Sequence, residues 1–411
     1  MRSNPSITDH NFFKSYKIKA ILIAFFFNFA ISNSFSDDLQ KCLWVKSSEL
    51  TSDNKIENLI SNAYRSGYKI IFLQVDIHQD SRYNPYLETI SVEPKFDPLK
   101  SALYWANWYD LEIHLWLNMY KIWSSTWAPP ENHIYYKLND IHKDWFSSDI
   151  NGHIDCDIQF NISEKKVLDS EGFQGIFLSP FNLDAQKYLT NIIINLIEKY
   201  KNSGQPSFSG IHLDYFRYKD SMYGYNYKGR KLFYDKYNID PIYLNKISNW
   251  ANKDSSLNLM NEWNLLKSKQ IDDFLYNISE IIKTYQNLKL SVAVKSNIYE
   301  AKIRWHQDWD NWIYLDYIDF VVVMNYYNDT ESFSNNLWDI YKYFDDKKNI
   351  NKIYIGISTL DDNLGVTQLR NSSIIRSQIN NTKDFSFPGL AIFSSEYFNF
   401  NPSLYLEIFN E

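Results

Sequence analysis

The segment Gly210–Tyr218 holds the residues of this chain that are best suited to chemistry. It reads Gly-Ile-His-Leu-Asp-Tyr-Phe-Arg-Tyr, a run with strand character that reaches a carboxylate at its fifth residue. Side chains alternate between the two faces of a strand, so His212 and Asp214 share one face while Ile211 and Leu213 share the other. Barrel enzymes place their catalytic groups at the carboxyl ends of such strands. The alternative is an ordinary strand end with a capping aspartate.

Segments with strand and helix character alternate along the chain. This alternation predicts a (β/α)8 barrel. A doubly wound open sheet is the alternative, although no glycine-rich phosphate-binding turn follows the first strand. The eight predicted strands are Leu43–Val45, Lys69–Asp76, Glu112–Asn118, Gly210–Asp214, Leu288–Lys295, Ile318–Asn325, Ile353–Ile357 and Gly389–Ser394.

Helices are predicted between these strands from their apolar stripes, caps and terminating residues. Two connections are much longer than normal, about residues 119–183 after the third strand and about 215–256 after the fourth. Both follow a strand, so in a barrel they would wall a cleft on its C-terminal face. The predicted helices span residues 53–66, 97–109, 184–202, 257–285, 308–315, 333–344, 372–380 and 402–409.

Four strands share one pattern, with polar side chains on one face and mostly branched aliphatic ones on the other. Helices should cover the aliphatic faces, so the polar faces are expected to converge at the barrel mouth. The sixth strand is apolar on both faces, and its orientation cannot be inferred. The polar faces carry Gln74 and Asp76; His114, Trp116 and Asn118; His212 and Asp214; and Ser291 and Lys295.

A cleft lined by carboxylate, amide, imidazole and indole groups suits a polyhydroxylated ligand, because indole rings stack on the apolar faces of sugars. Glycoside hydrolysis normally uses two carboxyl groups, about 5–5.5 Å apart in retaining enzymes and about 6.5–9.5 Å apart in inverting ones. Asp214 is the first candidate, and Asp76 is the favoured second because its orientation fits. Glu300, Asp329 and Glu396 follow other strand ends. The alternative for Asp76 is a surface or loop-capping carboxylate.

Other chemistries have less support. His212 and Asp214, with His114 nearby, could bind a metal ion, but the chain has only 8 histidines and no paired-histidine motif. No Gly-x-Ser-x-Gly elbow is present, and neither Cys42 nor Cys156 ends a strand. We therefore predict no metal and no cofactor. A bridge between the two cysteines and two free buried thiols both remain open.

Residues 1–36 resemble an export signal, and residues 37–411 are predicted to form a single barrel domain. Four basic residues precede or begin an apolar run, Ala20–Ile31, which is too short to span a bilayer comfortably, and small residues near Ser36 suit signal peptidase. Removal of residues 1–36 deletes four positive charges and one negative charge, which changes the formal net charge from −7 to −10. We expect an exported, periplasmic or extracellular protein with no stable membrane insertion and no affinity for nucleic acid.

Taken together, these motifs resemble the glycosyl hydrolase-like 10 family of exported bacterial barrel proteins. The third-strand and fourth-strand motifs are the specific ones, and the similarity spans about residues 42–395. The matching segments include Leu43–Val45, Phe72–Val75, Phe96–Leu99, Glu112–Asn118, His142–Trp145, Gly210–Asp214 with Arg217 and Tyr218, Asp308 and Trp309 with Trp312, Met324–Tyr326 and Ile355–Ile357.

The resemblance implies a glycosidase, with some members acting on peptidoglycan glycan strands. Asp214 would be the leading catalytic carboxylate. This chain departs from the family pattern at Asp76, where an arginine is usual, and at Trp263–Leu265, which lacks the family's arginines. A glycan-binding protein without catalytic activity is the alternative. The residues that the resemblance places along the substrate cleft are Gln74, His114, Trp116, Asn118, His212, Arg217, Asn325 and Tyr326.

Overall fold

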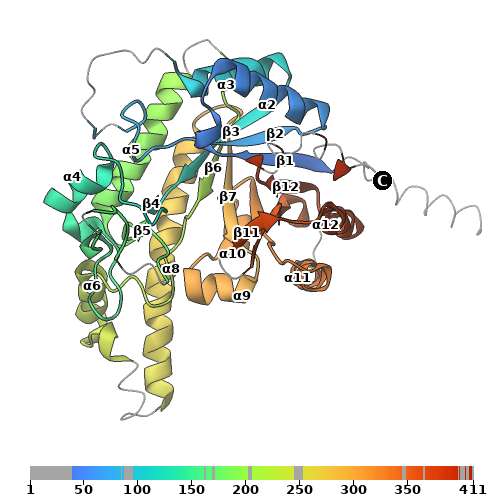
Figure 1. Cartoon of the computed structure of the whole chain (residues 1–411). Coiled ribbons are helices and arrows are strands. Elements are labelled where there is room, and N and C mark those ends of the chain that lie inside the picture. The colour runs from blue at the N-terminus through green and yellow to red at the C-terminus, as the bar shows by residue number, and fades with distance from the viewer. Residues whose placement is uncertain are drawn as a thin grey trace, which may run out of the picture. The chain divides into compact units, whose positions relative to one another are not determined.

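Eight parallel strands close into a barrel in the computed structural model of the chain (Figure 1). Around the barrel their order is β1–β12–β9–β8–β7–β6–β3–β2, and β2 pairs back with β1. Their bounds are Gln40–Val45 (β1), Ile70–Gln74 (β2), Glu112–Asn118 (β3), Gly210–Asp214 (β6), Lys289–Lys295 (β7), Phe320–Met324 (β8), Ile353–Ser358 (β9) and Gly389–Phe393 (β12).

The structure describes residues 39–409 except 85, 88–95, 162, 169–171, 202–205, 245–252, 345–348, 364–365, 397, 399–402 and 404–406. The predicted signal peptide, residues 1–36, lies outside the described residues. Half of the helix predicted over residues 402–409 also lies outside them.

The barrel prediction is confirmed, and each of the eight predicted strands is present. The open-sheet alternative is wrong because β1 has a parallel partner on both sides. Leu43 pairs with Ile71 of β2 and with Ile392 of β12. Strand β6 is buried at all 5 of its positions, as expected for parallel strands whose outer face is covered by helices.

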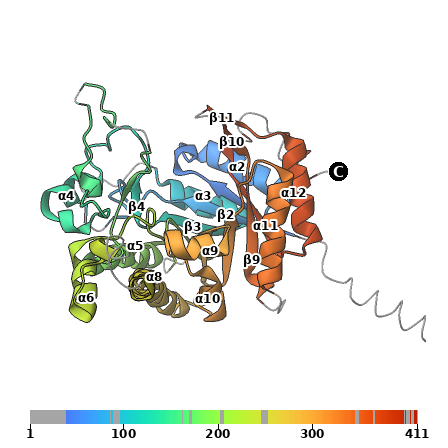
Figure 2. The same cartoon turned by 90° about the horizontal axis from the view of Figure 1, so that it is seen from below.

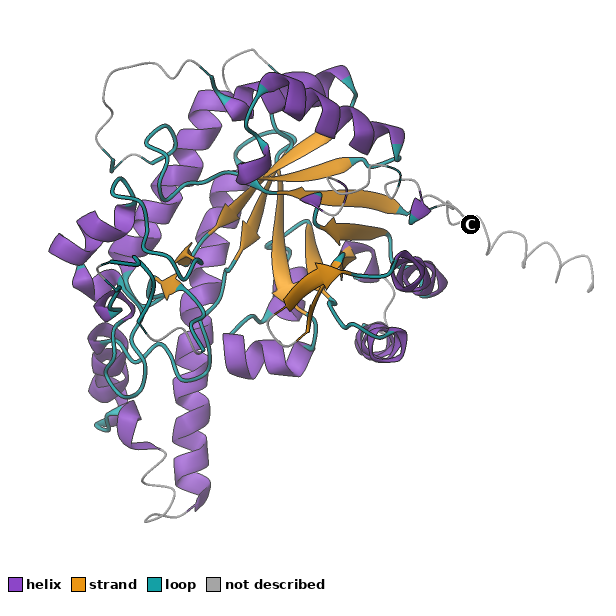
Figure 3. Ribbon diagram, viewed as in Figure 1, coloured by secondary structure: helices purple, strands orange, loops and turns teal. Residues whose placement is uncertain are grey.

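Helices cover the outside of the barrel (Figure 3). The caps were readable from the sequence: the Asp97 carboxylate accepts hydrogen bonds from the backbone N–H groups of Leu99 and Lys100, with Pro98 in the first turn. Figure 2 shows α11 and α12 side by side near β9. The outer helices are α2 (Asp53–Arg65), α3 (Pro98–Trp108), α5 (Leu183–Tyr200), α8 (Lys253–Lys283), α10 (Trp309–Tyr314), α11 (Thr330–Tyr343) and α12 (Ser372–Asp384).

Short elements occupy several connections. None of the helices within the described ranges has both the length and the apolar character to cross a bilayer. Two small antiparallel sheets pair β4 (Lys121–Trp123) with β5 (Ile176–Phe177) and β10 (Leu360–Asn363) with β11 (Val366–Leu369). The minor helices and turns are Ser47–Glu49, α4 (Ile134–Ile141), Lys143–Trp145, Asp155–Asp157, α6 (Tyr227–Tyr237), Pro241–Tyr243, α9 (Ile298–Glu300), Ala301–Trp305 and Ile350–Lys352.

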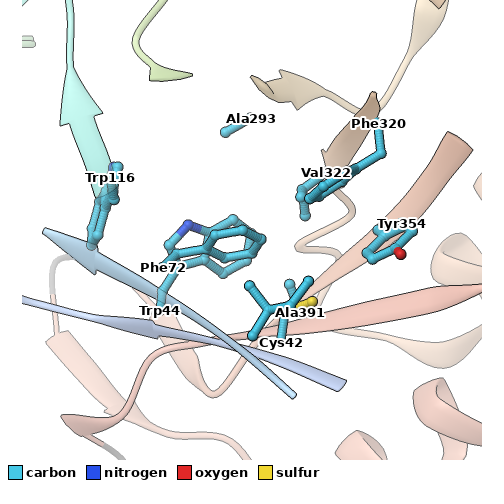
Figure 4. Packing of buried hydrophobic residues seen from close by; sticks show 10 residues of the cluster. Cys42, Trp44, Phe72, Trp116, Ala293, Phe320, Val322, Tyr354 and Ala391 are labelled. Atoms are coloured by element: carbon cyan, nitrogen blue, oxygen red, sulfur yellow. The ribbon is translucent and has the colours of Figure 1, made fainter. Parts of the chain in front are cut away.

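The barrel interior is filled mainly by apolar and aromatic side chains (Figure 4). Trp44, Phe72 and Phe320 pack together there, with Tyr354 stacked on Phe320 at a ring-centroid distance of 4.5 Å. Strand β8 faces inward through Phe320 and Val322, which settles the orientation that its sequence left open. The lumen is therefore a packed core and not a pore.

The two predicted insertions, after β3 and after β6, contact each other. Lys219 of the second insertion forms a buried ion pair with Asp155 of the first, with Nζ 2.9 Å from Oδ1. The N–H groups of Gly224 and Tyr225 both donate to the carbonyl of Ser148, at 3.0 Å each. The insertions are thus tied together beside the carboxyl ends of β3 and β6.

Candidate active site

A cleft of about 900 Å³ opens at the carboxyl ends of the barrel strands. Asp214, the last residue of β6, lines it. Five other predicted site residues line it too: Gln74, Trp116, Asn118, Arg217 and Tyr326. Lys295, expected at the barrel mouth, and the alternative carboxylates Glu300 and Asp329 line it as well. Residues that the sequence analysis did not place at the mouth complete the walls, among them Trp44, Lys46, Ser124, Tyr215, Trp305 and Phe393.

The Asp214 carboxyl group is held by two hydrogen bonds. Oδ2 accepts from the indole Nε1 of Trp116 at 3.1 Å, and Oδ1 accepts from the backbone N–H of Tyr215 at 2.6 Å. Tyr215 has a φ of 48°, in the left-handed region that non-glycine residues adopt at a cost. This turn directly after the strand aims the Tyr215 N–H back at the carboxyl group of the preceding residue.

Burial raises the pKa of Asp214 above its ordinary value, against the opposing effects of the Tyr215 and Trp116 hydrogen bonds and of the nearby Arg217. Only 8% of the residue is exposed. A carboxyl group with a raised pKa keeps its proton to higher pH, which is the property that a general acid needs. The same group faces a cleft large enough for sugar rings.

We expect Trp116→Phe to shift the pH profile of any Asp214-dependent hydrolysis. The lost indole N–H stabilises the carboxylate form, so its removal raises the pKa of Asp214 further. Activity that requires the protonated acid is lost as pH rises through that pKa, so the alkaline limb should move to higher pH. The measurement is kcat/KM against pH. Trp44→Phe is the matched control, because Trp44 lines the same cleft but donates to His212. An unmoved alkaline limb in Trp116→Phe would contradict the assignment.

His212 lies beneath the cleft and does not line it, which corrects its predicted role as a substrate contact. It is fully buried, and its Nε2 receives the indole N–H of Trp44 at 3.2 Å. Because an indole can only donate, Nδ1 carries the hydrogen and donates to Ser291 Oγ at 2.9 Å. The His212 ring therefore positions Trp44. Burial lowers the pKa of His212 well below the usual value. His212 and Asp214 are engaged by different partners, so they form no metal-binding pair.

His114 and Asn325 also lie away from the cleft. His114 is buried near the amino end of β3, where Nε2 is 3.3 Å from the Glu112 carboxylate. A Cβ atom at Gly210 would lie 2.5 Å from the His114 ring, so the residue facing it must be glycine. The Asn325 side chain is buried, and its amide donates to the carbonyl of Phe333 at 3.2 Å. His114 thus has the predicted inward orientation but the wrong depth, whereas Asn325 lies between the cleft residues Met324 and Tyr326 and points away from the cleft to Phe333.

Asp76 lies in a second pocket of about 610 Å³, beside the Asp214 cleft. Gln74 lines both pockets, whereas Asp76 lines only the second. Asp76 accepts a hydrogen bond from Gln79, and burial raises its pKa to about 6. The structure therefore places Asp76 and Asp214 in two different pockets, and the predicted pairing in one cleft is wrong. Strand β2 ends at Gln74, two residues before Asp76, although the Val75 N–H still donates to the carbonyl of Trp116 at 3.0 Å.

Two of the other candidate carboxylates do line the Asp214 cleft. Glu300 is ion-paired with Arg304 at 3.0 Å, and Asp329 caps α11 by accepting from Ser332 N–H at 2.7 Å. Glu396 is instead paired with Lys46 at 2.7 Å. Within the described ranges, no three His, Cys, Asp or Glu side chains gather in a way that could hold a metal ion. Cys42 and Cys156 are both buried free thiols.

The chain was compared with known families and proteins. The model of the family described as "Glycosyl hydrolase-like 10" matches residues 81–367, which include Asp214 and most of the cleft. No curated protein sequence matches the chain.

Solved structures share its fold at low sequence identity. The PgaB (BpsB) glycoside hydrolase domain from Bordetella bronchiseptica is 14% identical over 89% of this chain and 97% of that one, with a TM-score of 0.61. The catalytic domain of a β-amylase from Paenibacillus polymyxa is 11% identical over 90% and 95%, with a TM-score of 0.56. A β-galactosidase from Marinomonas ef1 is 10% identical over 87% and 54%, with a TM-score of 0.55. These likenesses concern the fold alone. The family match covers well over half of the chain, and the protein therefore belongs to the glycosyl hydrolase-like 10 family.

Proposed function

We propose that this protein is an exported glycoside hydrolase that cleaves a cell-envelope or extracellular polysaccharide, with peptidoglycan glycan strands among the candidates. The observation that carries the proposal is the Asp214 carboxyl group, buried at the strand end, facing the cleft and held by Trp116. Its raised pKa suits the donation of a proton to the glycosidic oxygen. The membership of a glycosyl hydrolase-like family agrees with this chemistry.

Aromatic side chains around Asp214 fit a sugar ligand. Trp44, Trp116, Trp305, Tyr326 and Phe393 all line the cleft. Tyr326 stacks on Phe393 with ring centroids 5.7 Å apart, so the two rings support each other in the cleft wall. Amide groups of Gln74 and Asn118 in the same walls can donate to and accept from hydroxyl groups. The combination of apolar platforms and amides is suited to a polysaccharide.

The test is a hydrolysis assay on purified polysaccharides. The protein without residues 1–36 is incubated with peptidoglycan glycan strands and with other envelope and extracellular polysaccharides, and new reducing ends are measured. We expect release from at least one substrate that increases with enzyme concentration. No release from any substrate, together with measurable binding, would favour the second candidate function.

That second candidate is a glycan-binding protein without hydrolytic activity. It is favoured by the state of the two other carboxylates in the cleft, since Glu300 is ion-paired and Asp329 caps a helix. A hydrolase normally needs a second carboxyl group that is available to water or to the sugar. Binding without cleavage in the assay above distinguishes the two.

We expect the second carboxyl group, where the reaction uses one, to come from the Asp214 cleft. Glu300→Gln should then lower kcat by about 10²-fold or more, the usual contribution of an acid–base or nucleophilic group. Asp76→Asn should affect mainly KM, because Asp76 lies in the neighbouring pocket. Both variants are compared by kcat and KM. A larger loss of kcat in Asp76→Asn than in Glu300→Gln would show that the adjoining pocket takes part in the reaction.

A further inference from the structure

Three basic side chains surround the inner end of the cleft without an anionic partner. Arg217 and Lys295 line the cleft, and Lys121 lies close enough to interact electrostatically with both. Among the described residues, no carboxylate oxygen lies within 4.0 Å of a side-chain nitrogen of any of these three. Arg217 is only 9% exposed and uses Nη1 to donate to the carbonyls of Tyr218 and Lys219 at 3.0 and 3.3 Å.

The other charges near this end are already matched. Lys46 is paired with Glu396 at 2.7 Å and Lys219 with Asp155 at 2.9 Å. Arg304 is paired with both Glu300 and Asp220, at 3.0 and 2.8 Å. Asp329 is exposed and caps α11. Asp214 interacts electrostatically with all three unmatched cations, whereas Asp220 and Glu300, which each act on one of them, are paired with Arg304.

Asp214 does not neutralise this excess. Its carboxyl oxygens accept from Trp116 and Tyr215, and neither oxygen lies within 4.0 Å of a nitrogen of the three cations. Burial and the charge of Arg217 lower the pKa of Lys121 and of Lys295 to about 8, so both remain mostly cationic at neutral pH. Like charges that are buried or half-buried repel each other, and they raise the free energy of the folded protein unless an anion binds between them.

The positions of these cations suit one substituent of a bound sugar. Lys295 ends β7 and Arg217 follows β6, and these strands are neighbours in the barrel. The Lys295 ammonium lies 4.7 Å from the centre of the Trp305 ring, which also lines the cleft. Lys295 therefore packs over the face of this ring, as does the Arg304 guanidinium at 4.7 Å, and the ring holds the ammonium group in the cleft wall. A guanidinium group with free N–H donors is well matched to an oxyanion.

We propose that the substrate is an acidic glycan whose sugar carries an oxyanion substituent, most simply a carboxylate, bound between Arg217 and Lys295 beside Asp214. The inference rests on the proposed function and specifies its substrate class. An oxyanion bound between Arg217 and Lys295 would form an ion pair with both side chains and offset the positive charge of the cleft. A neutral sugar of the same shape would leave Lys295 with the Trp305 ring but without an anionic partner.

The test uses matched pairs of oligosaccharides and the Asp214→Asn variant, so that binding is measured without cleavage. Each uronate-containing oligosaccharide is compared with its carboxyl-reduced form, and a sulfated oligosaccharide with its desulfated form. We expect at least one charged member to bind about tenfold more tightly than its neutral counterpart, as a charge-assisted hydrogen bond would give. The pair that shows the difference identifies the oxyanion.

Lys295→Gln, added to Asp214→Asn, should reduce that ratio to about one. The control is Lys289→Gln, which removes the same charge from the opposite end of β7, where Lys289 is paired with Glu112 at 2.9 Å. Lys289→Gln should keep the preference. Lys295 is chosen over Arg217 because Arg217 also holds two backbone carbonyls of its own loop.

Equal binding of charged and neutral members would overturn the inference, as would equal effects of Lys295→Gln and Lys289→Gln. Cleavage of neutral glycans with no preference for acidic ones would overturn the inference and leave the proposed hydrolase function intact. A preference for the charged member in a protein that cleaves no glycan would instead support the acidic ligand and contradict the hydrolase function.

Discussion

Asp214→Asn is expected to lower glycan hydrolysis by about 10²- to 10⁴-fold, the range that a positioned general acid contributes. The amide cannot donate an acidic proton to the glycosidic oxygen. Two groups donate to the Asp214 carboxyl oxygens, Trp116 Nε1–H and Tyr215 N–H. The single side-chain oxygen of asparagine replaces only one of these two acceptors. The expected result is therefore an inactive protein with a small loss of stability, on the order of 1 kcal/mol.

The measurement is kcat/KM on the best substrate, together with circular dichroism and thermal unfolding. Asp144→Asn serves as the control, because it removes an exposed carboxylate that pairs with Lys228 outside the cleft. It should leave hydrolysis unchanged. Turnover by Asp214→Asn within threefold of the parent protein would remove Asp214 from the mechanism.

Lys219→Met is expected to lower the free energy of unfolding by about 3–5 kcal/mol, the usual cost of removing one partner from a buried ion pair. Lys219 and Asp155 have side-chain exposures of 6% and 5%, so the remaining carboxylate would have little access to water. Asp155 would keep only the Phe177 N–H, which donates to Oδ2 at 2.8 Å. Because the pair joins the two insertions, activity should fall with stability.

This effect should depend on pH. The pKa of Asp155 is already raised to about 6 by burial, against the stabilising charge of Lys219, and loss of Lys219 would raise it further. A folded-state pKa above the unfolded value penalises folding as pH rises through it. The destabilisation by Lys219→Met should therefore be larger at pH 8 than at pH 5.

Urea unfolding at both pH values measures this prediction. The matched control is Lys228→Met, whose partner Asp144 lies 3.0 Å away in an exposed pair with side-chain exposures of 44% and 57%. An exposed pair contributes only about 0–1 kcal/mol. The added substitution Asp155→Asn should restore most of the stability lost in Lys219→Met. Equal effects of Lys219→Met and Lys228→Met would show that burial of the first pair is not important.

Much of the fold could be predicted because its signals are local. The alternation of strands and helices, the Asp97 cap and the two long insertions all follow from the order of nearby residues. The orientation of the strands was also readable, since Trp116 and Asp214 lie on the inward faces of β3 and β6, as their spacing predicted. The family motifs led to the same cleft.

Depth along the barrel axis was not readable. Residues on the same face of a strand recur every second position, but each residue advances the chain by about 3.3 Å, so His114 and Asn118 lie about 13 Å apart along the strand. Only Asn118 reaches the mouth, while His114 meets Glu112 near the opposite end. For the same reason His212 supports Trp44 from below and does not touch the cleft.

The sequence by itself thus determined the barrel, the inward faces of four strands and the place of Asp214 at a strand end. Only the tertiary structure decided that Asp76 lies in a separate pocket, that His212 holds Trp44, and that Arg217 and Lys295 stay unmatched while nearby charges are paired. Face and order are properties of a few consecutive residues. Depth, pocket membership and charge pairing depend on segments far apart in the chain, which meet only when the barrel closes.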